Sequence, residues 1–155
     1  MAINVPTGMN VQALMMMARV RAMQTLVNCL NIVKDECDKN VPVDLGTLRE
    51  SIRIESPKWI TPYLVEGKVL AGGGNVPQAW YTEYGTNAHG PVFAQAMHFN
   101  WKGAEIFAKW VQGVTPMHWM RNAVTFAIPR IQAEMGLLAK QFLGTYTVTL
   151  TKRGL

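Results

Sequence analysis

The sequence predicts an α+β fold, in which a long N-terminal helix and a C-terminal helix pack on a small, mainly antiparallel sheet with an inserted β-hairpin. Two helical patterns, over residues 10–39 and 116–143, enclose a region of alternating apolar and polar residues at 52–70. The insertion at 87–115 adds two further short strand patterns. No internal repeat or low-complexity block divides the chain, so we expect a single domain over residues 1–155.

The first predicted helix, residues 10–39, contains no glycine and no proline. Its apolar residues recur every three or four positions, which is the pattern of a buried helix face. Further apolar side chains widen this face, so the sheet can cover one side of the helix and a neighbouring chain the other. Cys29 and Cys37 lie about 12 Å apart along such a helix. This is too far for a disulfide bond, and we expect reduced thiols, as in a cytosol. The stripe comprises Val11, Met15, Ala18, Ala22, Leu26, Cys29 and Val33.

A short helix is predicted directly after the long one. Pro42 disfavours helical geometry in the residue before it, so the long helix ends there. Asp44 can cap the short helix by accepting backbone N–H groups, and Gly46 gives its first turn backbone freedom. Leu48 and Ile52 are four residues apart and can pin this helix to the core.

Two strands are predicted next. Residues 52–55 alternate apolar and polar side chains, as a half-buried strand does, and residues 63–70 form a second strand. The proline-bounded segment 57–62 predicts a break between them. The glycine-rich segment 71–75 predicts a loop, and it lacks the Lys-Ser/Thr pair of a phosphate-binding loop.

The insertion and the C-terminal helix follow. Residues 94–101 and 105–111 predict a hairpin. Thr115 as a cap and Pro116 in the first turn predict the start of the C-terminal helix. Pro129 lies inside this helix and should kink or split it.

The last residues, 144–155, form a strand-like arm by pattern. Tyr146, Val148 and Leu150 face one way and the intervening threonines the other. A terminal strand needs an edge with which to pair. Either the chain's own sheet or, by strand addition, a neighbour's sheet can supply it. The three apolar residues are therefore candidates for an inter-subunit arm.

Composition restricts the classes of function. Apolar residues make up 49% of the chain and charged residues 16%, below the roughly 25% usual in soluble domains. Either partners bury part of the surface, or the domain is an ordinary, well-packed one. The net charge of +5 is compatible with DNA contact, but the cations are scattered, as on a solvated surface. No long uncharged apolar run predicts a membrane span, and no secretory signal precedes the first helix.

Catalytic and metal-binding patterns are weak. His89, His98 and His118 are far apart in the sequence and have no cysteine or paired acid beside them, so surface or interface roles are favoured over metal binding. Glu83, a carboxylate between Tyr81 and Tyr84, is a candidate catalytic acid, but no second carboxylate follows closely enough to make a glycosidase pair. We expect Glu83 to accept hydrogen bonds from backbone groups or from an arginine such as Arg49. We assign no catalytic, cofactor-binding or metal-binding residue.

Three segments together resemble one family. They are Pro42-Val43-Asp44-Leu45-Gly46-Thr47-Leu48-Arg49-Glu50-Ser51-Ile52, Tyr81-Thr82-Glu83-Tyr84-Gly85-Thr86, and the helix start Pro116-Met117-His118-Trp119-Met120-Arg121-Asn122-Ala123. In this order, after a long helix, they are similar to the tail-completion or head–tail joining proteins of long-tailed bacteriophages. Leu45 stands where this family usually has threonine. The resemblance covers about residues 8–143. It marks Pro42, Asp44, Gly46, Leu48, Arg49, Ser51, Tyr81, Glu83, Gly85, Thr86 and Pro116 as motif residues with a structural role.

The resemblance implies a structural virion protein without enzymatic activity or cofactor. Such a protein is a subunit of a six-fold or twelve-fold homo-oligomeric ring in the phage neck. It is assembled in the host cytoplasm, completes the tail and joins it to the DNA-filled head. The implied partners are adaptor or head-completion proteins, tail-tube or tail-terminator proteins, and DNA contacted non-specifically in the lumen.

Two alternatives from other classes stay open. One is a basic DNA-binding protein that acts alone, which would need clustered cations and salt-sensitive binding. The other is a hydrolase that uses Glu83 and a histidine.

Overall fold

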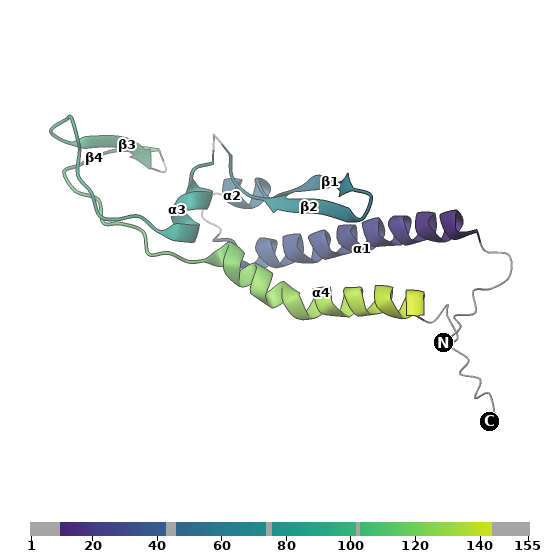
Figure 1. Ribbon diagram of the computed structural model, residues 1–155. Helices are drawn as coiled ribbons and strands as arrows, with labels where there is room; N and C mark the ends of the chain where they lie inside the picture. Colours follow the sequence, from purple (N-terminus) through teal and green to yellow (C-terminus); the bar gives the residue numbers. More distant parts are fainter. Residues whose placement is uncertain (1–9, 43–45, 74–75, 102, 144–155) are drawn as a thin grey trace, which may run out of the picture.

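The computed structural model describes residues 10–42, 46–73, 76–101 and 103–143. It confirms the α+β class: two long helices accompany two small antiparallel hairpins, which are separate sheets (Figure 1). In chain order the elements are α1 (Val11–Asn40), α2 (Thr47–Glu50), β1 (Arg53–Thr61), β2 (Leu64–Leu70), α3 (Gln78–Tyr84), β3 (Met97–Trp101), β4 (Ala104–Ala108) and α4 (Trp119–Leu143).

Helix α1 is the central element of the molecule. Its first turn is capped by Asn10, whose side chain accepts the N–H of Gln12 at 2.9 Å. It ends at Asn40, two residues before Pro42, as the sequence predicts. Cys29 and Cys37 are free and buried on this helix, where their spacing keeps them too far apart for a disulfide bond.

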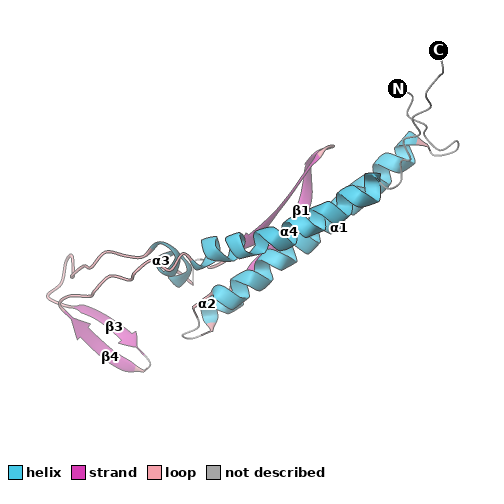
Figure 2. Ribbon diagram, turned by 90° about the horizontal axis from the view of Figure 1, so that it is seen from below, coloured by secondary structure: helices cyan, strands magenta, loops and turns pink. Residues whose placement is uncertain are grey.

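The β1–β2 hairpin packs on one side of α1, and α4 lies along another (Figures 1 and 2). Gly67 of β2 lies directly against Leu30, where a Cβ atom would collide with the leucine side chain. Helix α4 runs antiparallel to α1. Its Arg130 guanidinium is 3.0 Å from the Glu36 carboxylate, and its Glu134 accepts a hydrogen bond from Asn28 at 3.3 Å.

The sequence predicts that residues 57–62 separate the two strands, and for most of this segment the prediction is wrong. Strand β1 continues to Thr61 and pairs with β2 as far as Leu64. Pro57 is tolerated inside β1 because the register shifts between Glu55 and Lys58, which places the proline at an irregularity where no ladder hydrogen bond is needed.

The core is small and lies where the C-terminal half of α1 meets α2, α3 and the start of α4. Leu48 and Ile52, from the region of the predicted short helix, are buried in it, so their prediction as core anchors is confirmed. Burial raises the pKa of the Cys37 thiol to about 11, and nearby Asp38 adds to the shift. The buried cluster is Cys37, Val41, Leu48, Ile52, Trp119 and Ala123.

Helix α4 begins at Trp119, so the predicted start at Thr115 and Pro116 is wrong. The residues before it are extended because their backbone bonds elsewhere: the N–H of Met117 donates to Thr82 O, and that of His118 to Glu83 O. His118 has φ 51°, which turns the chain into the helix. Helix α4 stays continuous through Pro129, and its ribbon bends along its length (Figure 1), as the predicted kink requires.

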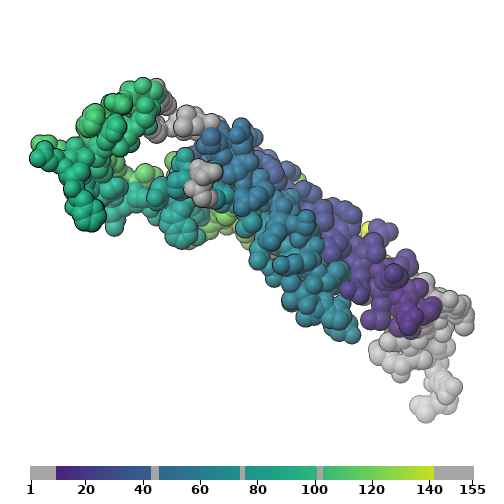
Figure 3. All heavy atoms as spheres, turned by 90° about the horizontal axis from the view of Figure 1, so that it is seen from above, coloured from purple at the N-terminus to yellow at the C-terminus, as the bar shows by residue number. Residues whose placement is uncertain are grey.

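The β3–β4 hairpin projects away from the rest of the molecule. Its strands pair over Met97–Trp101 and Ala104–Ala108, shorter than the sequence suggests. Figures 1, 2 and 3 show it at one end of an elongated molecule, beyond α3. We call residues 87–115 the arm and the remaining described residues the body.

Candidate subunit interface

The family-like motif residues meet at the junction of α2, α3 and α4. Leu48 lies in the core. The Ser51 hydroxyl accepts the N–H of Gly72 at 2.8 Å and donates to Leu48 O at 2.6 Å, which ties α2 to the loop after β2. Gly46 has φ +80° at the start of α2, a conformation that favours glycine. Arg49 is exposed on α2.

Glu83 is the buried polar residue at this junction. It lies at the end of α3, and its carboxylate accepts the backbone N–H groups of Met120 at 2.8 Å and Arg121 at 3.3 Å. These are first-turn donors of α4 with no partner inside the helix, and the helix dipole favours a negative charge there. Of the two predicted partners, backbone groups rather than Arg49 are confirmed, and Glu83 acts as a cap supplied from another helix.

Neighbours of Glu83 reinforce this link between α3 and α4. The Thr82 hydroxyl accepts the indole N–H of Trp119 at 3.1 Å. His118, one residue before α4, has a buried Nδ1 without a hydrogen-bond partner.

The remaining motif residues close the base of the arm. The N–H of Thr86 donates to Val114 O at 2.9 Å, and the N–H of Val114 donates to the Thr86 hydroxyl at 3.0 Å. Gly85 has φ +75°, and a Cβ atom there would lie only 2.6 Å from Val114 O and 2.8 Å from Pro116 Cδ. Glycine is therefore required at this crossing. Tyr81 is exposed, although its carbonyl accepts the N–H of Gly85 at 2.8 Å.

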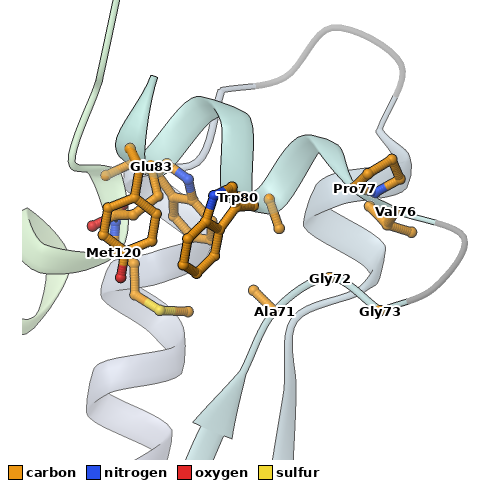
Figure 4. A pocket seen from close by; sticks show the side chains of 11 residues that line it. Ala71, Gly72, Gly73, Val76, Pro77, Trp80, Glu83 and Met120 are labelled. Carbon is orange, nitrogen blue, oxygen red and sulfur yellow. The ribbon is translucent and has the colours of Figure 1, made fainter. Parts of the chain in front are cut away.

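A hollow of about 340 Å³ opens beside the junction (Figure 4). Ala71, Gly72, Val76 and Met120 are among its lining residues, and so is Trp80, which is exposed. Among the described residues of this lining, Glu83 is the only one with an acidic or basic side chain, and α4 already uses both of its oxygens. The rest of the described lining is mostly apolar.

Exposed apolar side chains are the dominant feature of the described surface. Among the described residues, 23 large hydrophobic side chains are exposed, whereas 10 hydrophobic residues are buried. They lie on the N-terminal half of α1, on the β1–β2 hairpin, on α3, on the arm, at Met117 before α4 and on α4 itself. Phe93 in the arm is 100% exposed. Large exposed apolar patches are typical of protein–protein, membrane or ligand contact sites.

The described charges form no basic stripe. Four cations pair with acids: Lys34 with Asp38, Lys39 and Arg130 with Glu36, and Lys68 with Glu66. The hydrogen bond from Lys39, supported by Arg130, lowers the pKa of Glu36. Arg19 instead lies over the Trp59 ring at 4.6 Å.

The histidines lie apart. His98 stacks on Phe107 at 4.5 Å in the hairpin, and His89 pairs with Val111 in the stalk of the arm. In the part of the chain that the structure describes, no three His, Cys, Asp or Glu side chains come together as a metal site would require. Likewise, none of the described helices is long and apolar enough to cross a membrane.

Asp44 and the candidate inter-subunit residues of the C-terminal segment, Tyr146, Val148 and Leu150, lie outside the described residues. The sequence reading also missed Phe93, Trp80 and Trp110 as surface aromatics. Their only signal is an aromatic side chain in a segment without clear alternation, which does not distinguish exposed from buried positions.

Comparisons with known proteins add no relative: no family model, curated protein or solved structure matches the chain. The described surface is distinguished by its many exposed apolar side chains.

Proposed function

We propose that this chain is a structural virion protein, a subunit of an oligomeric ring in the neck of a long-tailed bacteriophage. The ring completes the tail and joins it to the DNA-filled head. One observation carries the proposal: an elongated subunit buries a small core and exposes large apolar side chains on several faces. The motif resemblance supplies the phage neck as the place of assembly.

A closed ring suits this distribution of apolar surface. In a ring, each subunit uses two different surfaces, one toward each neighbour, and a suitable rotation closes the assembly. The arm lies at one end of the molecule, and the exposed side of α4 lies along the body (Figure 1). Two distinct apolar surfaces on one subunit are what head-to-tail contacts need.

Contact with DNA is a secondary part of the proposal. The net charge of +5 suits a passage for DNA, because a positive surface attracts the phosphates of DNA instead of repelling them. A protein that binds DNA alone is less well supported, because the described cations are dispersed and several are paired with acids. Affinity that falls steeply between low and moderate salt would favour that alternative.

The test is light scattering on the purified chain over a range of concentrations, with negative-stain images of the same samples. We expect closed rings with six-fold or twelve-fold symmetry, whose mass gives the number of subunits. A chain that stays monomeric throughout contradicts self-assembly. Titration of DNA binding against salt then separates a ring that forms only on a neck partner from a solitary DNA-binding protein.

A further inference from the structure

A groove of about 410 Å³ lies between the N-terminal part of α1 and strand β1. Its α1 residues recur at spacings of three and four, which places them on one face of the helix. Two of them, Met16 and Val20, are 72% and 65% exposed in the described chain. We call this feature the α1 groove. Its apolar lining consists of Met16, Val20, Met23, Val27 and Trp59.

One charged side chain, that of Arg19, is among the described residues that line the α1 groove. Its guanidinium carbon lies 4.6 Å from the centroid of the Trp59 ring, which is a cation–π contact. A guanidinium group stacked on a ring keeps the N–H donors in its own plane available for a carboxylate. No described carboxylate forms an ion pair with Arg19. The ring of Trp59 therefore holds a cation at the edge of an apolar floor.

The neighbouring charges leave Arg19 unmatched. From Val11 to Val33, helix α1 contains no Asp or Glu, and the two acids of the β1–β2 hairpin both interact with Lys68. Arg21 follows Arg19 by two residues, about 200° around the helix axis, and does not line the groove. The α1 groove thus combines an apolar floor with one positive charge, and a complementary occupant is both apolar and acidic.

The shape of the groove fits a helix better than a lipid or DNA surface. Side chains three and four residues apart on α1 form rows between which the side chains of a second helix can pack. The methionines adapt to an irregular occupant. A bilayer presents no ridge that enters a concave floor, and DNA binding needs several cations on phosphates, whereas Arg19 is the single cation of the described lining. An acidic amphipathic helix satisfies these conditions, in the manner of other helix-in-groove complexes.

Other apolar surfaces of the described chain lack this combination. The hollow beside α3 contains Glu83, but α4 already uses both of its oxygens. In the β3–β4 hairpin, the exposed Phe107 stacks on His98, which in turn lies 3.8 Å from Glu105. Charges of both signs at that position specify no complement. The unmatched cation of the α1 groove does specify one.

We propose that the α1 groove binds an amphipathic helix of another protein, and that a carboxylate of this helix pairs with Arg19. Apolar side chains of the same helix pack on Met16, Val20 and the ring of Trp59. The inference goes beyond the proposed ring, because it assigns a docking site for a different protein and uses no contact between ring subunits.

The first test selects binders from a library of helical peptides with randomised surfaces, with the full-length chain as the target. We expect the enriched peptides to carry apolar residues at spacings of three and four, with Asp or Glu beside them. Their affinity should fall at least about tenfold for Arg19→Gln, because a hydrogen-bonded charge is lost. Arg21→Gln, on the other side of the same helix, is the matched control and should bind like the unmodified chain.

Three results of this selection would contradict the proposal. The library could yield no binder, the enriched peptides could lack acidic residues, or the two variants could bind them with equal affinity. Circular dichroism of both variants shows that the helices are intact, so that a lost affinity is not a lost fold.

An exchange of charges tests whether the contact with Arg19 is direct. Arg19→Glu should abolish binding of an enriched peptide, because two carboxylates then face each other. Replacing the acid of the peptide with lysine should restore binding to Arg19→Glu and abolish binding to the unmodified chain. If the altered peptide binds neither chain, Arg19 does not contact the carboxylate and the proposal is wrong.

NMR of isotope-labelled methionine methyl groups locates the occupant on the full-length chain. An enriched peptide should shift the signals of Met16 and Met23 and leave that of Met97 in the hairpin unchanged; Met→Leu variants assign the signals. Shifts confined to other methionines would overturn the proposal. So would shifts of Met16 and Met23 caused by vesicles of phosphatidylcholine and phosphatidylserine but not by the peptide, or by changes in the concentration of the chain alone. A membrane or a second copy would then be the occupant.

This proposal and the ring proposal can fail separately. Rings that form from a chain that binds no acidic helical peptide would overturn the groove proposal and leave the ring intact. A chain that binds the peptide through Arg19 but stays monomeric at all concentrations would contradict self-assembly and leave the groove proposal intact.

Discussion

The body and the arm of this protein differ in how far their apolar side chains are buried. In the body, apolar side chains are buried around Cys37, and the buried carboxylate of Glu83 is fully used as a cap. In the arm, the aromatic side chains of Phe93, Phe107 and Trp110 are exposed, and the strand edges are open. The body therefore has a core formed by its own contacts, whereas no described residue of the arm belongs to that core.

The largest expected contrast is between two tryptophans. Trp119 is 3% exposed in the core, and Trp110 is 65% exposed in the arm. Trp119→Ala should lower the free energy of unfolding by about 3–5 kcal/mol, because it leaves a cavity, whereas Trp110→Ala should change it by less than about 0.5 kcal/mol. Urea unfolding followed by circular dichroism measures both values. Equal losses would show that the arm is part of the stable core.

A second contrast concerns two glutamates. Glu83→Ala leaves first-turn N–H groups of α4 without their acceptor, and should cost about 1–3 kcal/mol of unfolding free energy. Glu83→Gln keeps one acceptor oxygen and should cost less. Glu105 in the hairpin is mostly exposed, and Glu105→Ala should have no measurable effect. If Glu83→Ala were as neutral as Glu105→Ala in the same urea assay, the capping role would be wrong.

The smallest contrast concerns thiols. The folded Cys37 thiol keeps its proton up to a pKa of about 11, but in the unfolded chain the pKa is near 9.0. Between these values the unfolded state binds fewer protons, so the free energy of unfolding should fall as the pH rises from 9.0 to about 11. Urea titrations across this range should show a steeper fall for the unmodified chain than for Cys37→Ala. Parallel curves would place Cys37 in contact with solvent.

Much of the body could be predicted from local sequence patterns. The end of α1 before Pro42 and the core anchors Leu48 and Ile52 depend on neighbouring residues and short spacings, which can be read from the sequence. The predicted apolar stripe of α1 is only partly confirmed, because Cys29 is buried but Val11 and Met15 at its start are exposed. The α+β class followed from these elements. The α3 helix was not assigned, because its seven residues are too few to show a periodic face.

The errors arise where distant contacts override local preference. Thr115 and Pro116 have the chemistry of a helix start, but hydrogen bonds from Met117 and His118 to α3 hold that stretch extended and move the start to Trp119. The cap from Glu83 crosses more than thirty residues of sequence. Sequence spacing could favour a structural role for Glu83 but could not identify the N–H groups that it accepts.

The crossing at Thr86 and Val114 has a consequence for how such chains can vary. Because Thr86 and Val114 are hydrogen-bonded to each other, the residues between them form a single loop that is closed at its base. The entropy cost of closing a loop grows slowly, by about 0.6 kcal/mol for each doubling of its length. Insertions or deletions within residues 87–113 therefore leave the body nearly as stable as before. Related chains could evolve a longer or shorter arm, and so contact neighbours of different size or spacing, without redesigning the core.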